Sequence, residues 1–195
     1  MTPPTYRLVY PDGPHDAESM LTDRSGRVYV VSKGLTGGSV YRSGPRLSTS
    51  GTNRLKRVAD VREFATDAAM LPDHRHVLIR SYGDAGLYTF PGFRRLGGFP
   101  LPSQPQGEGI SVGRNGRIRL SSEGRDSAVL QVALPADLEA KIATQASPTP
   151  TGSAGPSRTG WGAVAGDTST WWWAVPAVIL AGGAALALRI RRRRR

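Results

Sequence analysis

The stretch ESMLTDRSGRVYVVSKG, residues 18–34, decides the fold because related stretches occur twice more in this chain of 195 residues. The second copy is AAMLPDHRHVLIRSYG, residues 68–83, and the third is EGISVGRNGRIRLSSEG, residues 108–124. The first and third copies align without a gap, whereas the second lacks one residue in its central turn. Repetition at about 40–50 residues predicts an array of similar structural units.

Each copy has the pattern of a β-hairpin. A short apolar segment leads into a turn containing Asp, Asn or Gly, and a more apolar segment then runs to a Ser-x-Gly sequence. Asp and Asn side chains stabilise such turns, and Gly26 and Gly116 can adopt the positive φ that a tight reversal requires. We predict a third strand in each unit, at residues 39–42, 86–90 and 128–134, and a more polar fourth strand in two units, at 53–61 and 94–101.

Four antiparallel strands per unit at this spacing are typical of the blades of a β-propeller. The third unit has no fourth strand of its own, but the N-terminal segment, residues 5–10, has the sequence of one. Its Arg7 and Leu8 align with Arg57 and Val58. The sequence therefore predicts an all-β domain over residues 1–143, a partial propeller of about three four-stranded blades.

Three blades do not make a complete propeller, because closed rings have about four to eight. We expect an open arc to expose two apolar blade faces, which would drive self-association. One hypothesis is that further blades and an export signal precede Met1 in a longer protein. The other is that two copies pair into a six-bladed ring.

The C-terminal part of the sequence predicts a membrane anchor. Residues 144–170 are rich in Ser, Thr, Gly and Pro and are interpreted as a disordered linker. Eighteen uncharged residues follow from Trp171 to Leu188, and five arginines end the chain. This pattern predicts a transmembrane helix at 171–190 in contact with membrane lipid, a cytoplasmic tail at 191–195 and an extracytoplasmic N-terminal domain. Sortase anchoring through PSRTG, residues 156–160, is the alternative.

Charge and cysteine content exclude several classes of function. The net charge is +11, but Arg189 and residues 191–195 contribute six of these charges, which leaves 11 − 6 = +5 scattered over the remainder. A nucleic-acid-binding protein would cluster its basic residues on one face, so no nucleic-acid partner is predicted. The chain has no cysteine, which excludes disulfides and thiolate metal sites.

Two segments, PDGPHDAESMLTDRSGRVYVVSKG (residues 11–34) and PQGEGISVGRNGRIRLSSEGRD (residues 105–126), carry a resemblance to known proteins. They resemble blade motifs of lactonase-like and NHL-type six-bladed propellers, and more closely those of membrane-anchored propellers of high-GC Gram-positive bacteria. The resemblance covers about residues 6–134. It implies the fold rather than a chemistry, because propellers host many unrelated functions.

Three carboxylates stand where the innermost strands of a propeller would ring its central channel: Glu18, Asp67 and Glu108. Oxygen ligands of this kind suit Ca²⁺ or Mg²⁺. The resemblance to lactonase-like propellers implies that such an ion would polarise a substrate carbonyl. The alternative is that these carboxylates accept hydrogen bonds from backbone amides between blades.

The middle position of the Ser-x-Gly loops varies from unit to unit, as Lys33, Tyr82 and Glu123, which is the pattern of a ligand-binding rim. No Gly-x-Ser-x-Gly sequence is present, and no catalytic nucleophile is predicted. We therefore predict a membrane-tethered, extracytoplasmic binding or scaffold module for an unknown protein or small-molecule ligand. The alternative is a metal-dependent hydrolase of the lactonase or phytase-like esterase type.

Overall fold

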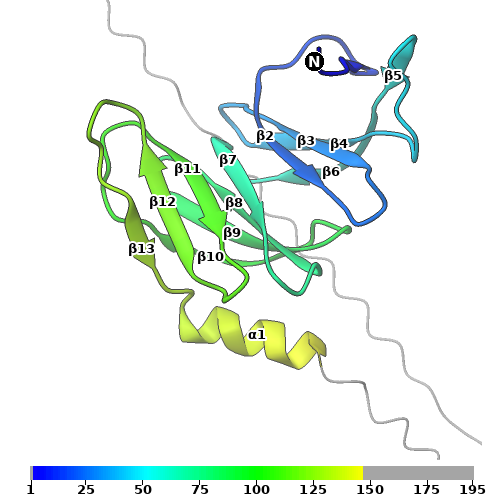
Figure 1. Cartoon of the computed structure of the whole chain (residues 1–195). Helices are drawn as coiled ribbons and strands as arrows, with labels where there is room; N and C mark the ends of the chain where they lie inside the picture. The colour runs from blue at the N-terminus through cyan, green and yellow to red at the C-terminus, as the bar shows by residue number, and fades with distance from the viewer. Residues whose placement is uncertain (1, 147–195) are drawn as a thin grey trace, which may run out of the picture. The chain divides into compact units, whose positions relative to one another are not determined.

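The computed structural model of the chain describes residues 2–146 (Figure 1). The predicted transmembrane helix, the arginine tail and the linker beyond residue 146 therefore lie outside the described residues. Within residues 2–146, no helix combines the length and the apolar character needed to cross a membrane.

The repeated units form three antiparallel sheets, which we call blades 1, 2 and 3. Blade 1 consists of β2 (Ala17–Thr22), β3 (Val28–Ser32), β4 (Gly38–Arg42) and β6 (Lys56–Val61). Blade 2 consists of β7 (Asp67–Met70), β8 (His76–Arg80), β9 (Asp84–Thr89) and β10 (Arg95–Pro100). Blade 3 consists of β11 (Gly107–Val112), β12 (Ile118–Ser122) and β13 (Leu130–Val132). The predicted four-stranded units are thus confirmed for the first two blades, and the third has three strands among the described residues.

The blades pack side by side, with β7 next to both β2 and β11. Blades 1 and 2 share one hydrophobic cluster that includes Tyr29, Val31 and Ile79. Blades 2 and 3 share a second cluster that includes Leu78 and Leu120. This arrangement is consistent with a partial propeller.

The face of each end blade that points away from blade 2 is called its far face. The far face of blade 3 is polar. In β12 the buried side chains alternate with exposed ones, whereas every residue of β3 and β8 is buried. Ser111, Arg119 and Ser121 are exposed at the positions that Leu21, Tyr29 and Val31 occupy in blade 1. The expectation of an apolar face was therefore wrong for this blade. Terminal units of repeat proteins commonly carry such a polar outer face, because nothing packs on it.

The far face of blade 1 is partly covered by the N-terminal segment, and Met20 on this face is exposed. Leu8 and Tyr10 pack against Val28, Val30 and the buried ring of Tyr41. The segment contains β1 (Arg7–Val9), which pairs in parallel with β5 (Thr52–Arg54) rather than with the sheet of a blade. The strand expected at residues 53–61 is therefore divided into β5 and β6.

A C-terminal helix, α1 (Ala136–Ala146), packs below blade 2 and was not predicted (Figure 1). Its Leu138 is 1% exposed and belongs to the cluster between blades 2 and 3. Nζ of Lys141 donates a hydrogen bond to the carbonyl of Leu96 in β10, at 3.0 Å. Gly97 lets the helix approach β10 closely, because a Cβ atom there would lie 2.5 Å from Cδ2 of Leu138 and would displace that side chain. The domain boundary predicted at residue 143 falls inside this helix.

Candidate ligand-binding rim

Five of the six predicted site residues gather where the innermost strands begin, and we call them the rim cluster: Glu18, Lys33, Tyr82, Glu108 and Glu123. Lys33 is its centre, in the loop between β3 and β4. Its Nζ donates to Oε2 of Glu18 at 2.7 Å and to the hydroxyl of Tyr82 at 3.1 Å. The second contact joins blade 1 to blade 2.

The Lys33 ammonium is enclosed on several sides. Its side chain is only 9% exposed, and Nζ lies 4.9 Å from the ring centroid of Phe64 and 5.1 Å from that of Tyr82. Aromatic rings at this distance attract a cation. Burial alone would lower the pKa of Lys33, but its hydrogen bonds to Glu18 and Tyr82 and the charge of Glu18 raise it above its ordinary value. Lys33 therefore keeps its positive charge at neutral pH.

Glu108, in β11, interacts with the two other carboxylates of the rim cluster, Glu123 of the same blade and Glu18 of blade 1. Burial raises the pKa of Glu108, and the negative charges of Glu123 and Glu18 raise it further, while Lys33 opposes them. Lys33 is thus hydrogen bonded to Glu18, and its charge also acts on Glu108. The structure brings these residues together, and their role in binding stays a prediction.

Asp67 is turned away from this cluster toward backbone amides. Its Oδ1 accepts a hydrogen bond from the N–H of Ala68 at 2.8 Å, and its Oδ2 accepts one from Ile110 at 2.7 Å. The second bond ties blade 2 to blade 3. Burial raises the pKa of Asp67, while these bonds and the charge of Arg80 oppose the rise. Asp67 thus accepts a hydrogen bond from a backbone amide of the neighbouring blade, which is the alternative to metal binding given above.

The metal site at Glu18, Asp67 and Glu108 stays a prediction. Across residues 2–146, no group of three or more His, Asp or Glu side chains is arranged to hold a metal ion.

Arg80, in β8, binds the backbone next to Glu108, and it was not predicted as a site residue from the sequence. It is fully buried, and its guanidinium donates to the carbonyls of Gly109 at 2.5 Å and Ser121 at 3.0 Å, and to Oε1 of Gln104 at 3.0 Å. Burial lowers the pKa of Arg80, while the charges of Asp67 and Glu108 oppose this. The sequence signal that could have identified Arg80 is a charged residue at the end of the mainly apolar strand HVLIR, residues 76–80.

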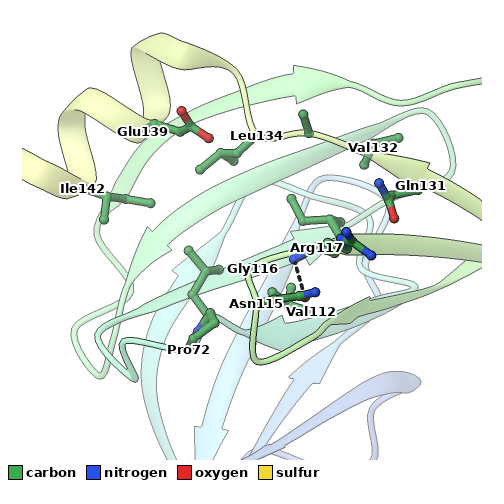
Figure 2. A pocket seen from close by; sticks show the side chains of 13 residues that line it. Pro72, Val112, Asn115, Gly116, Arg117, Gln131, Val132, Leu134, Glu139 and Ile142 are labelled. Carbon is green, nitrogen blue, oxygen red and sulfur yellow. Dashed lines mark hydrogen bonds between the residues drawn. The ribbon is translucent and has the colours of Figure 1, made fainter.

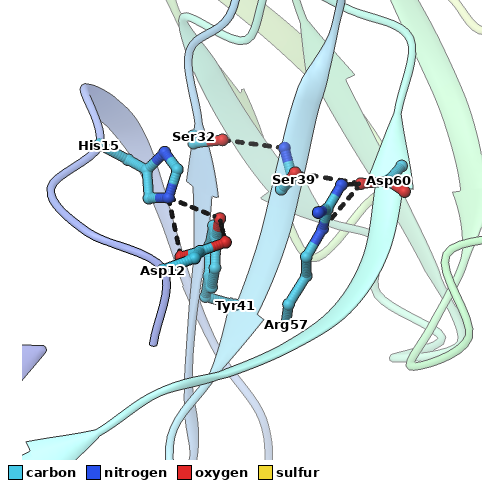
Figure 3. A network of polar contacts seen from close by, with 7 residues as sticks. All are labelled: Asp12, His15, Ser32, Ser39, Tyr41, Arg57 and Asp60. Carbon is cyan, nitrogen blue, oxygen red and sulfur yellow. Dashed lines mark hydrogen bonds and ion pairs between the residues drawn. The ribbon is translucent and has the colours of Figure 1, made fainter. Parts of the chain in front are cut away.

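A second polar group fixes the N-terminal segment to blade 1 (Figure 3). The hydroxyl of Tyr41 donates to Oδ2 of Asp12 at 2.9 Å and lies 2.8 Å from Nε2 of His15. The same nitrogen lies 2.9 Å from Oδ1 of Asp12. The ring of Tyr10 packs edge-on against Tyr41, with centroids 4.7 Å apart. We call Asp12, His15 and Tyr41 the N-terminal network.

Acid is expected to release this segment. The hydrogen bond from His15 lowers the pKa of Asp12 below its ordinary value, and the bond from Tyr41 adds to this. A carboxyl with a lowered pKa in the folded state stabilises that state above its ordinary pKa, and the contribution is lost as pH falls through the folded value. We therefore expect pepsin to cleave within residues 2–16 much faster below about pH 4 than at pH 5.

Asp12→Asn tests whether ionised Asp12 holds the N-terminal segment, because this substitution removes the charge at any pH. This variant should be cleaved rapidly already at pH 5, where pepsin is still active. Equal cleavage of variant and parent at pH 5 would show that Asp12 does not hold the segment.

The structure also contains a pocket of about 370 Å³ at the opposite end of blade 3 from the rim cluster (Figure 2). The lining of this pocket is mainly apolar, and Arg117 and Glu139 are among its polar residues. It contains none of the predicted site residues. The full lining is Leu71, Pro72, Val112, Asn115, Gly116, Arg117, Ile118, Gln131, Val132, Ala133, Leu134, Glu139 and Ile142.

No known family and no curated protein matches this chain. The solved structures that match this chain weakly are β-propeller-like proteins. A protein from Lactobacillus plantarum is 12% identical over 60% of this chain and 40% of its own, with a TM-score of 0.38. A glucose dehydrogenase is 14% identical over 61% and 40%, with a TM-score of 0.40. Virginiamycin B lyase from Staphylococcus aureus is 16% identical over 64% and 43%, with a TM-score of 0.38.

The matched part therefore spans less than half the length of each of these structures. Matches this weak carry no argument about substrate, and the assignment of the fold rests on the three antiparallel sheets themselves.

Proposed function

We propose that this protein is a binding module that recognises a positively charged ligand at the rim cluster. The observation that carries the proposal is the gathering of acidic side chains around the enclosed ammonium of Lys33, which donates to Glu18 and Tyr82. Burial, the charges of Glu123 and Glu18 and a hydrogen bond with Glu123 raise the pKa of Glu108. Like charges held together cost stability, and such perturbed groups concentrate at functional sites. A cation placed between Glu108 and Glu123 would relieve the repulsion. Nζ of Lys33 donates to Glu18 and Tyr82, and its charge offsets only part of the rise in the pKa of Glu108.

We further propose that the module is tethered to the outer face of a membrane. The uncharged run from Trp171 to Leu188 and the arginines after it support this location. The hydrolase alternative would require Asp67 to give up its amide partners, Ala68 and Ile110, before it could bind an ion.

Calorimetric titration of the full chain in detergent tests the binding site, with Ca²⁺ and spermidine as separate cationic probes. We expect at least one probe to bind, and Glu108→Gln combined with Glu123→Gln to weaken it at least tenfold, about 1.4 kcal/mol. The matched control is Glu139→Gln, since Glu139 lies on α1 beside the pocket at the other end of blade 3. The proposal fails if neither probe binds, or if the double variant and the control bind alike.

Glu108 of the rim cluster is also expected to affect the thermal stability of the protein. Because its folded pKa is raised, charged Glu108 disfavours the folded state at neutral pH, and protonation on acidification relieves this. We therefore expect Glu108→Gln to raise Tm by about 1–4 °C at pH 7 and to lose this advantage at about pH 4. Differential scanning calorimetry at both pH values measures it. A Tm that falls at pH 7 would mean that Glu108 stabilises the fold and that the cluster is structural.

A further inference from the structure

The outer edge of blade 3 lacks the strand that the other two blades have. In blade 1, β6 pairs with β4, and in blade 2, β10 pairs with β9. In blade 3, β13 is the outermost strand, and no strand within residues 2–146 pairs with its outer side. An unprotected edge presents unpaired N–H and C=O groups and readily accepts another strand.

The N-terminal strand has the properties of the missing one. Its Arg7 and Leu8 align with residues of β6, and it stands at a similar distance from the innermost strand that follows. From the end of β1 to the start of β2 is 17 − 9 = 8 residues, against 67 − 61 = 6 after β6 and 107 − 100 = 7 after β10. Its present pairing, with β5, involves only three residues.

This strand cannot reach β13 within one chain. It lies against blade 1, where Leu8 and Tyr10 pack on Val28 and Val30, and blade 2 separates blade 1 from blade 3. We propose that β1 of a second copy adds to β13, and that the reciprocal contact closes a two-fold ring of six blades. Two identical contacts related by a two-fold axis form a closed assembly, and six blades lie within the usual range.

The register of the contact follows from blade 1. Transferring the pairing of β4 with β6 to β13 places Gln131 opposite Tyr6, and Val129 opposite Val9, of the second copy. Tyr6 is 43% exposed and Val129 is 64% exposed. Met20, on the far face of blade 1, is also 64% exposed. Three of the five large apolar side chains exposed within residues 2–146 therefore lie at the two ends of the arc that would meet.

The polar far face of blade 3 indicates a reversible contact. Ser111, Arg119 and Ser121 are exposed in the single copy, and interfaces that open and close are about as polar as ordinary protein surface. We therefore expect a dimer that depends on concentration, with a single copy that is stably folded by itself.

Disulfide trapping tests the pairing directly, because the chain has no cysteine of its own. Tyr6→Cys and Gln131→Cys are placed in separate full-length chains, purified in detergent, mixed and oxidised. Residues opposite each other in neighbouring strands lie within the Cα separation that a disulfide allows, about 4.4–6.8 Å. We expect the mixed dimer to form at least tenfold faster than either like pair, and the doubly substituted chain to stop at a covalent dimer.

Leu35→Cys mixed with Gln131→Cys is the control, because Leu35 is 93% exposed and lies away from the proposed contact. Sedimentation of the unsubstituted chain provides a second measurement, independent of any variant. A mixed dimer that forms no faster than this control, or a chain that remains monomeric at all concentrations tested, overturns the proposal. A ladder of larger covalent oligomers would replace the closed ring with an open chain of copies.

Discussion

Replacing Arg80 with alanine is expected to lower the free energy of unfolding by about 3–5 kcal/mol. The guanidinium is fully buried, and it donates to the carbonyls of Gly109 and Ser121 in blade 3. Without it those two carbonyls lose their donor, Asp67 loses the charge that favours its ionised form, and a cavity opens between blades 2 and 3. Urea denaturation followed by circular dichroism measures the change.

Arg75→Ala is the matched control, because Arg75 is an exposed arginine on the turn before the same strand. It should change stability by less than about 0.5 kcal/mol. Equal stability of Arg80→Ala and Arg75→Ala would show that the bonds of Arg80 do not hold the blades together. Arg80→Lys should recover only part of the loss, because an ammonium cannot reproduce the fixed fork of donors.

Replacing Leu138 with alanine is expected to lower the free energy of unfolding by about 2–5 kcal/mol. Leu138 contributes a buried side chain from α1 to the cluster that blades 2 and 3 share. The truncation leaves a cavity above Gly97 and loosens the helix from β10. Hydrogen exchange of the amides of α1 should therefore accelerate more than that of β3 in blade 1, whose side chains belong to other hydrophobic clusters than Leu138.

Leu35→Ala provides the comparison for an exposed leucine, since Leu35 is 93% exposed. Little change is expected there. If Leu138→Ala leaves both the denaturation curve and the exchange of α1 unchanged, the helix does not stabilise the domain.

The repeat predicted the hairpins because its chemistry is local. Asp23, Asp73 and Asn115 stabilise the three turns through their own side chains. Oδ1 of Asp23, for example, accepts hydrogen bonds from the N–H groups of Ser25 and Arg27. The alternation of the strands then determines which side chains meet between blades. The same reasoning placed Lys33 and Tyr82 in equivalent loops of neighbouring blades, where they are found hydrogen bonded.

Other features depend on contacts between distant segments and have no local signal. Asn53 donates to the carbonyl of Arg7, 46 residues away, and this helps to hold β5 beside β1. α1 has no counterpart in the repeat, and the linker predicted at residues 144–170 begins inside it. The helix docks through Leu138, whose partners lie in distant strands. Asp67 looked like a potential ligand from its position, but its partner Ile110 is a backbone amide of another blade.

The water-facing side of blade 3 has a consequence for how large an assembly can grow. A head-to-tail contact that fails to close continues without limit and produces fibres. With serine and arginine in place of leucine, tyrosine and valine on that side, sheet stacking alone gives too little adhesion to propagate in this direction. Substitution of Ser111, Arg119 and Ser121 by the residues of blade 1 would remove this restraint and strengthen stacking of one copy on another through this side.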